Sequence, residues 1–342
     1  MNVFELTMEI EGNHASFAGS ILVHDGEQTV LQQAYGLANR SEQMANQVDT
    51  RYGMASGCKI FTAVAICKLV ERGLLTFETP LHTCMDISGT SWSQEITIHH
   101  LLTHSSGVPD YFDEEYMTDY SELWQTTPMY TILSPRDMLP LFQDQPMKFN
   151  PGERFSYNNS GYILLGIIVE NVSGMPFHAF VTQHVFEACG MRDSGYYRLD
   201  QLPERTATGY MLDKEGAWRT NMYSIPIMSL PDGGAFTTTA DMDIFWTSLV
   251  NNRLLTEEIT RTMLTPFVKS SEYVSYGYGV WINTVDNEVI KYYVMGCDPG
   301  VGLISSLYMK TKARVHVLSN LTNGASKLGH RINELLFQVS KR

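Results

Sequence analysis

The sequence lacks the features that mark a disulfide-rich, membrane-spanning or nucleic-acid-binding protein. Its five cysteines form no CxxC pair and are odd in number, which argues against a disulfide framework or a zinc knuckle. No stretch reaches the roughly 18 uncharged apolar residues of a membrane span. Positive charge is also scarce, because 24 lysines and arginines stand against 37 acidic residues, for a formal net charge of -13. Since phosphate-backbone binding calls for a basic stripe, nucleic acid is not an expected partner.

The N-terminus lacks the pattern of a secretory signal. Glu5, Glu9 and Glu11 lie where a signal would place basic residues followed by an apolar run. Together with the unpaired cysteines this predicts a cytoplasmic location, and export by a leader absent from this sequence stays open. Hydrophobic residues make up 44% and charged residues 18%, the balance of a globular protein. The chain is long enough for one large domain or two lobes.

Strand patterns occur at both ends of the chain, with helical patterns between them. Asp25-Gly26 separates two apolar runs and predicts a hairpin, and a helix is expected from about Ser56 to Gly73. The last third predicts strands around 276–283, 288–296, 301–310 and 314–320, then a helix over 325–339.

This order of elements predicts an α+β fold, in which an antiparallel sheet built from both ends of the chain is flanked by helices. We expect residues 1–85 and 195–342 to form one discontinuous lobe and residues 86–194 a mostly helical insertion lobe. A cleft between two lobes is the usual place for a ligand. The oligomeric state is not predicted.

The stretch MASGCKIFTAVAICKLV places a lysine near the start of an otherwise small and apolar helix. Spacing three puts Ser56 and Lys59 on one helix face. A serine hydroxyl becomes a nucleophile when a neighbouring base takes its proton, and a desolvated lysine can serve as that base. The alternative is that Lys59 only extends from a helix end to solvent, since Ser-x-x-Lys alone is a weak pattern.

Two further segments carry groups suited to acyl chemistry. Tyr157 and Asn159 follow the Pro151-Gly152 turn, and a phenol near a lysine can act as a base while an asparagine amide can hold an amide substrate. Gly296 ends a strand pattern and lets a ligand approach the backbone, so the next amide, from Cys297, can face an oxyanion. The alternatives are a turn tyrosine with an asparagine helix cap, and a strand that ends in a Pro-Gly turn.

The order of these three segments resembles the serine β-lactamases and penicillin-binding proteins, most closely the branch of class C β-lactamases, D-alanyl-D-alanine carboxypeptidases and esterases. The stretches that carry the resemblance are YGMASGCKIFTAVAICKLVERGLL, ITIHHLLTHSSGVPDYF, FNPGERFSYNNSGYILLG and GGAFTTTADMDIF.

The resemblance implies the β-lactamase/transpeptidase-like fold and a role for each site residue. Ser56 would be the acylated nucleophile, Lys59 its proton partner and Tyr157 the general base that works with Lys59. Asn159 would hold the substrate amide. The backbone amides of Ser56 and Cys297, next to Gly296, would form the oxyanion hole. On this reading Lys59 is tolerated because Ser56 and Tyr157 share its proton.

The chain departs from the family at one position of the third motif. Members usually carry Lys or His two residues before the glycine, and this chain has Val294. Lys291 lies on the other face of the strand, because side chains alternate along it. Loss of this donor weakens recognition of a substrate carboxylate by about ten- to a hundredfold.

We therefore expect a serine hydrolase that cleaves an ester, a small amide or a peptide bond, with weak turnover of β-lactams. The alternative is a penicillin-binding or sensor-like protein with slow or no turnover. The only partner expected is a small-molecule ester, amide or peptide substrate, with no membrane partner.

No metal and no cofactor is expected. His99, His100 and His104 flank a helix end without cysteine or carboxylate at ligand spacing, which favours a structural role. Cys58 is expected to be a buried apolar cysteine that projects away from Lys59. Gly233-Gly234 is interpreted as scaffold beside the cleft, and Asp298 either tunes the charge of the substrate site or shapes the Pro-Gly turn.

Overall fold

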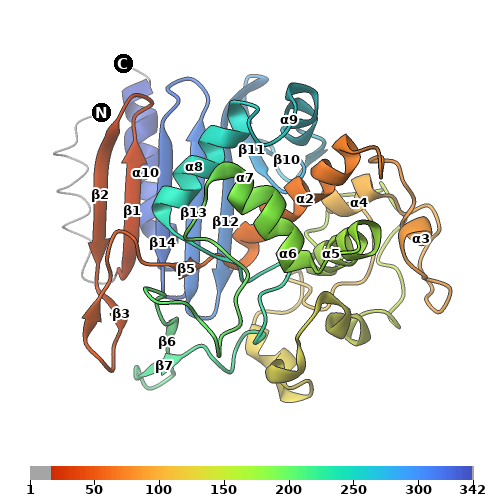
Figure 1. The fold of residues 1–342 in the computed structure, drawn as a ribbon, viewed down its shortest axis with the longest axis horizontal. Helices are drawn as coiled ribbons and strands as arrows, with labels where there is room; N and C mark the ends of the chain where they lie inside the picture. The colour runs from red at the N-terminus through yellow and green to blue at the C-terminus, as the bar shows by residue number, and fades with distance from the viewer. Residues whose placement is uncertain (1–16, 341–342) are drawn as a thin grey trace.

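An eight-stranded antiparallel sheet forms the centre of the protein, whose structure is a computed structural model that describes residues 17–340 (Figure 1). The three N-terminal glutamates discussed above lie outside the described residues. The strand order is β2-β1-β14-β13-β12-β11-β10-β9, so the two ends of the chain lie side by side in one sheet. Its strands are β1 (Gly19–His24), β2 (Thr29–Tyr35), β9 (Val268–Lys269), β10 (Val274–Tyr276), β11 (Trp281–Val285), β12 (Glu288–Asp298), β13 (Val301–Tyr308) and β14 (Arg314–Ser319).

Short strands pair outside this sheet, and most helices lie between β5 and β9 in the chain. The short strands are β3 (Leu37–Asn39), β4 (Met44–Ala45), β5 (Tyr52–Gly53), β6 (Tyr210–Leu212), β7 (Trp218–Thr220) and β8 (Phe236–Thr237). The helices that matter below are the 3₁₀ turn η2 (Ala55–Cys58), α2 (Lys59–Glu71), α3 (Leu81–Cys84), α4 (Ile98–Leu102), α5 (Asn159–Ser173), α6 (Phe177–Val181), α7 (Glu187–Cys189), α8 (Thr239–Val250), α9 (Glu257–Met263) and α10 (Ser326–Ser340).

Local sequence explains where the two central helices end. Helix α2 stops before Gly73, whose φ of 68° suits a residue without a Cβ. Helix α5 starts where the Asn158 side chain accepts a hydrogen bond from the Gly161 N–H, and it stops at Gly174, which adopts φ of 70°. The predicted end of α2 at Gly73 is confirmed.

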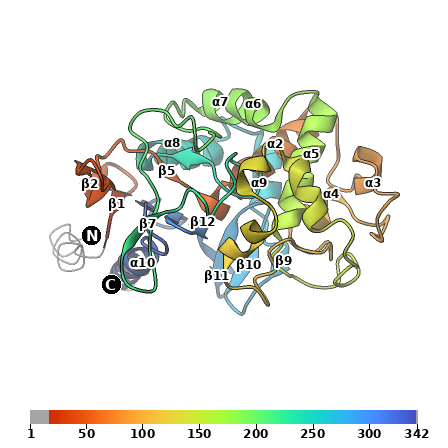
Figure 2. The ribbon, with the colours of Figure 1, turned by 90° about the horizontal axis from the view of Figure 1, so that it is seen from below.

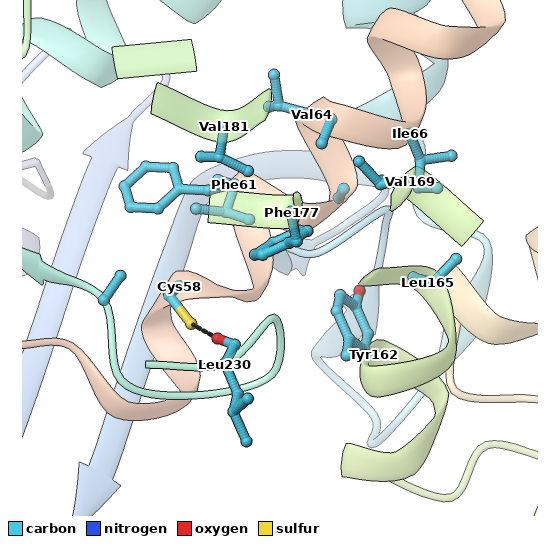
Figure 3. Packing of buried hydrophobic residues seen from close by; sticks show 14 of the residues in the cluster. Cys58, Phe61, Val64, Ile66, Tyr162, Leu165, Val169, Phe177, Val181 and Leu230 are labelled. Carbon is cyan, nitrogen blue, oxygen red and sulfur yellow. Dashed lines mark hydrogen bonds between the residues drawn. The ribbon is translucent and has the colours of Figure 1, made fainter. Parts of the chain in front are cut away.

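Apolar side chains cover both faces of the sheet. Helices α8 and α10 lie on opposite faces (Figure 2). Under α10, Leu328 and Ile332 pack in a small cluster with residues of β1, β13 and β14. On the other face, α2 packs against α5 and α6 in the main core, where Phe61, Val64 and Val181 lie together (Figure 3). Burial of this kind provides most of the stability of such helices.

The predicted α+β architecture, an antiparallel sheet flanked by helices, is confirmed. The division into lobes at residues 85, 86, 194 and 195 stays a prediction. Among the described residues, no single helix is long and apolar enough to cross a membrane, and one bent pair, Asn159–Ser173 with Phe177–Cys189, meets the criteria of length and composition only when taken together.

Candidate active site

The turn that carries Ser56 is held in a strained shape against strand β12. Ala55 adopts φ of 47°, a conformation that residues with a Cβ rarely take. Gly296 of β12 lies so close to this turn that a Cβ on it would stand 2.0 Å from the carbonyl oxygen of Met54. On the other side, the Met54 N–H donates to the Ala235 carbonyl at 2.7 Å. The Gly296 backbone and the Ala235 carbonyl therefore hold the turn between them.

Lys59 is 1% exposed and lies at the centre of the site. Its Nζ donates to Ser56 Oγ at 2.9 Å, to Asn159 Oδ1 at 2.8 Å and to the backbone oxygen of Asp232 at 2.7 Å. A buried ammonium is costly unless its donors find acceptors, and here three acceptors surround it. The Ser56 contact follows from the three-residue spacing on the helix.

Tyr157 contacts Lys59 through its ring, with Nζ 5.0 Å from the ring centre. The ring stacks on Trp281, and the centre of the His104 imidazole lies 4.4 Å away. Burial raises the pKa of Tyr157 well above its usual value, and the interaction with the Ser56 hydroxyl opposes this rise. The expectation that Tyr157 shares the Lys59 proton stays a prediction.

The amide of Asn159 is engaged at both ends. Its oxygen accepts from Lys59, and its Nδ2 donates to Asp110 Oδ2 at 3.3 Å and to the Phe112 carbonyl at 3.2 Å. Asp110 also accepts from the backbone N–H groups of Asn159 and Ser160 at the first turn of α5. Burial raises the pKa of Asp110 to about 7, although these hydrogen bonds and Lys59 oppose the rise. Sequence reasoning missed Asp110, because it reaches the helix from a separate loop.

Strand β12 alternates as expected on either side of Gly296. Val294 and Gly296 are buried, while Met295 and Cys297 are exposed. Cys297 lines the same cavity as Ser56, and its Sγ donates to Asn323 Oδ1 at 3.0 Å. Lys291 does not line this cavity. Its Nζ lies 4.6 Å from the ring centre of Tyr293, and burial lowers its pKa to about 8. Lys291 therefore does not replace the missing group at position 294.

A cavity of about 1290 Å³ opens above Ser56. Ser56, Asn159 and Cys297 line it, together with the acidic residues Asp232 and Asp298. Asp232 is 3% exposed and accepts a hydrogen bond from the Tyr111 hydroxyl. Sequence reasoning missed Asp232, and the only local signal was its place before Gly233-Gly234.

The three histidines each have a packing role. His99 Nδ1 lies 2.8 Å from the Tyr278 hydroxyl, His100 completes the cap of α4, and His104 Nδ1 accepts from the Asn158 N–H at 3.1 Å. Within residues 17–340, no group of three or more His, Cys, Asp or Glu side chains is placed to hold a metal ion. Cys58 is buried, and its Sγ points to the Leu230 carbonyl (Figure 3).

Comparison with known proteins shows the family of this chain. The sequence model described as Beta-lactamase matches residues 8–329. A penicillin-binding protein of Bacillus subtilis (strain 168) is 27% identical over 330 residues, which cover 91% of this chain and 70% of that protein. The crystal structure of a penicillin-binding protein from Bacillus halodurans is 45% identical with a TM-score of 0.92, and the match covers 98% of this chain and 100% of that chain.

A solved structure with lower sequence identity has the same fold. A D-amino acid amidase from Ochrobactrum anthropi SV3 is 20% identical with a TM-score of 0.81 over 99% of this chain and 100% of that chain, which shows the shared fold alone. The fold expected from the resemblance, β-lactamase/transpeptidase-like, is therefore confirmed. From the match over most of its length, the chain belongs to the beta-lactamase family of hydrolases.

Proposed function

We propose that this protein is a serine hydrolase that forms an acyl-enzyme at Ser56 and cleaves an ester, a small amide or a peptide bond. The observation that carries the proposal is the 2.9 Å hydrogen bond between Lys59 Nζ and Ser56 Oγ at the wall of a large cavity. A nucleophile held by a base, which is itself held by further groups, is the usual signature of covalent catalysis.

The proposed first step transfers the acyl group to the enzyme. Ser56 Oγ bonds to the carbonyl carbon while its proton passes to the Lys59–Tyr157 pair, in the state of that pair that carries one proton fewer than an ammonium beside a phenol. Lys59 Nζ lies 5.0 Å from the centre of the Tyr157 ring. The carbonyl oxygen gains negative charge, and the backbone N–H groups of Ser56 and Cys297 are the donors proposed for it. The bond to the leaving alcohol or amine then breaks, and the leaving group takes the proton from the pair.

The proposed second step releases the acyl group to water. The same pair takes a proton from water as the water oxygen bonds to the acyl carbon, and the bond to Ser56 Oγ breaks with return of the proton to the serine. Asn159 holds Lys59 in place through its amide oxygen. Val294 leaves the site without the usual donor for a substrate carboxylate, so esters and small amides are proposed as better substrates than β-lactams.

Initial rates of hydrolysis at neutral pH test the proposal. The three substrates are p-nitrophenyl acetate, nitrocefin and a small p-nitroanilide. We expect wild-type protein to hydrolyse p-nitrophenyl acetate faster than nitrocefin, and Ser56→Ala to lose at least 99% of both activities. Ser271→Ala is the matched control, because Ser271 is exposed and does not line the cavity. An alanine variant at Ser56 with wild-type rates on the ester, on nitrocefin and on a small p-nitroanilide would refute the proposal.

A further inference from the structure

The contacts of the Asn159 side-chain amide fix which of its two orientations it adopts. Its Oδ1 accepts from Lys59 Nζ at 2.8 Å, and its Nδ2 donates to Asp110 Oδ2 at 3.3 Å and to the Phe112 carbonyl at 3.2 Å. A rotated amide would place its NH2 group against the Lys59 ammonium and its oxygen against two acceptors. These contacts therefore decide that an oxygen, and not an NH2 group, faces Lys59.

Asp110 is the charged member of these contacts, and it is 6% exposed. Its Oδ2 also accepts from the Asn159 backbone N–H at 2.8 Å, while its Oδ1 accepts from the backbone N–H of Ser160 at 3.0 Å and from the Ser160 hydroxyl at 3.2 Å. An ionised carboxylate accepts hydrogen bonds and donates none. Asp110 can therefore bind the NH2 end of the Asn159 amide but not its oxygen end.

Hydrogen bonds thus connect Asp110 through Asn159 and Lys59 to Ser56. Lys59 Nζ lies 2.9 Å from Ser56 Oγ, and the Lys59 side chain is 1% exposed, so little water is available to replace a lost acceptor. If the Asn159 amide rotated, the Lys59 ammonium would lose one of its three acceptors and would meet a donor instead. Lys59 would then have to move, and its contact with Ser56 would change.

We propose that Asp110 is a positioning residue for the Ser56 site: it fixes the Asn159 amide with its oxygen towards Lys59, and so holds Lys59 within hydrogen-bond distance of Ser56. This inference rests on the proposed function, because it concerns the base proposed for the same nucleophile. The role differs from capping of helix α5, which uses only the backbone N–H groups of Asn159 and Ser160.

The first test is the variant Asp110→Asn. Asparagine has nearly the same shape as aspartate, but its NH2 group can donate to the oxygen of a rotated Asn159 amide. We expect kcat on p-nitrophenyl acetate at about pH 8 to fall by about ten- to a hundredfold, the range for loss of a hydrogen bond to a charged group. KM should change by less than about threefold, because Asp110 does not line the cavity. A wild-type kcat would overturn the inference.

The variant Asn159→Ala separates positioning from helix capping. It keeps both backbone N–H groups that Asp110 binds and removes only the side-chain amide. In an Asn159→Ala background, Asp110→Asn should therefore change kcat by less than about threefold. A loss by the same factor in both backgrounds would assign Asp110 to capping alone and overturn the inference. Asn159→Ala with a wild-type kcat would overturn it as well, whether or not Asp110→Asn folds.

The pH profile of kcat/KM decides where Asn159→Ala is too slow for this comparison. Without the Asp110 charge, the Lys59–Tyr157 pair loses its proton more easily, so the acid limb should move to lower pH by about half a pH unit or more in Asp110→Asn. The Asp110 carboxyl, whose pKa burial raises to about 7, also no longer titrates. A lost cap would lower the profile without moving it, so an unmoved acid limb would overturn the inference. The other ionisable groups that act on this pair are unchanged in the variant, and they are Cys58, His104, Glu114, Asp232, Tyr276 and Asp298.

Thr256→Ala is the matched control, because it removes a cap from a different helix. The Thr256 side chain accepts from the Ile259 N–H at the start of α9, is exposed and does not line the cavity. This variant should lower the melting temperature, as loss of a cap does, and keep the wild-type kcat and acid limb. A fall in its kcat equal to that of Asp110→Asn would show that any lost cap has this effect and would overturn the inference.

The outcomes separate this inference from the proposed function. Turnover that depends on Ser56, with a wild-type kcat in Asp110→Asn, overturns the positioning role and leaves the hydrolase proposal standing. Turnover that survives in Ser56→Ala overturns both.

Discussion

Replacing Gly296 by alanine tests how the strand and the catalytic turn depend on each other. The added Cβ would lie 2.0 Å from the Met54 carbonyl oxygen and 2.8 Å from the Gly57 nitrogen, whereas real Cβ atoms stay beyond 3.0 Å from such neighbours. Strand β12 and the turn therefore have to move apart by about 1 Å. Overpacking of this size costs about 1–3 kcal/mol of stability.

The effect on catalysis should be larger than the effect on folding. The shift separates the amide of Cys297 from Ser56, and a misplacement of about 1 Å costs roughly a hundredfold in rate. We expect kcat of Gly296→Ala on p-nitrophenyl acetate to fall by about a hundredfold, while thermal unfolding by circular dichroism stays cooperative.

The matched control is Gly89→Ala. Gly89 is exposed, and a Cβ there would meet no atom within 4 Å. This variant should keep the wild-type kcat and melting temperature. A Gly296→Ala protein with wild-type kcat would refute the reasoning, because it would mean that the contact between β12 and the turn does not set the geometry of the site.

Three further predictions concern Lys59 as the base, the loop whose carbonyl binds Lys59, and the loss of stability at low pH. Lys59→Met should lower the rate of ester hydrolysis by about 10²- to 10⁴-fold, the range for loss of a general base, and stopped assays of p-nitrophenol release measure it; a rate within threefold of wild type would contradict the assignment. Gly166→Ala should lower both kcat and melting temperature, because a Cβ there would stand 2.1 Å from Pro231 and push the loop whose carbonyl binds Lys59; unchanged values of both would contradict it. Arg314 and His316 help to hold the pKa of Asp243 well below its usual value, and burial lowers the pKa of His316. Both groups therefore bind protons more readily in the unfolded state than in the folded state. The free energy of unfolding should fall as the pH drops from about 6.5 towards 3. Melting temperatures should show a smaller loss over this range when both groups are replaced, in Asp243→Asn combined with His316→Gln, and an equal loss would refute the link.

Local patterns were sufficient to predict the parts of the site that are close in sequence. Ser56 and Lys59 meet because they are three residues apart on one helix, and Gly296 was identified because a glycine at a strand end permits close approach. The hairpin at Asp25-Gly26 and the ends of α2 and α5 follow from the same kind of local chemistry.

The rest of the site depends on contacts across long stretches of chain. The Asp232 carbonyl is 173 residues from Lys59, and Asp110 is 49 residues from the helix start that it caps. No periodicity or spacing reports such contacts. Burial also decided the state of Tyr157, since a phenol enclosed by Trp281 and His104 holds its proton more tightly than the sequence alone would suggest.

The most direct test of the central claim is the mass of the intact protein during turnover. Rapid acid quench after mixing with a slowly released ester or a β-lactam should give a protein heavier by one acyl group, and peptide mapping should place that group on Ser56 in wild type and nowhere in Ser56→Ala. An acyl group found on another residue, or Ser56-dependent turnover in which no covalent species forms at any quench time, would contradict the account.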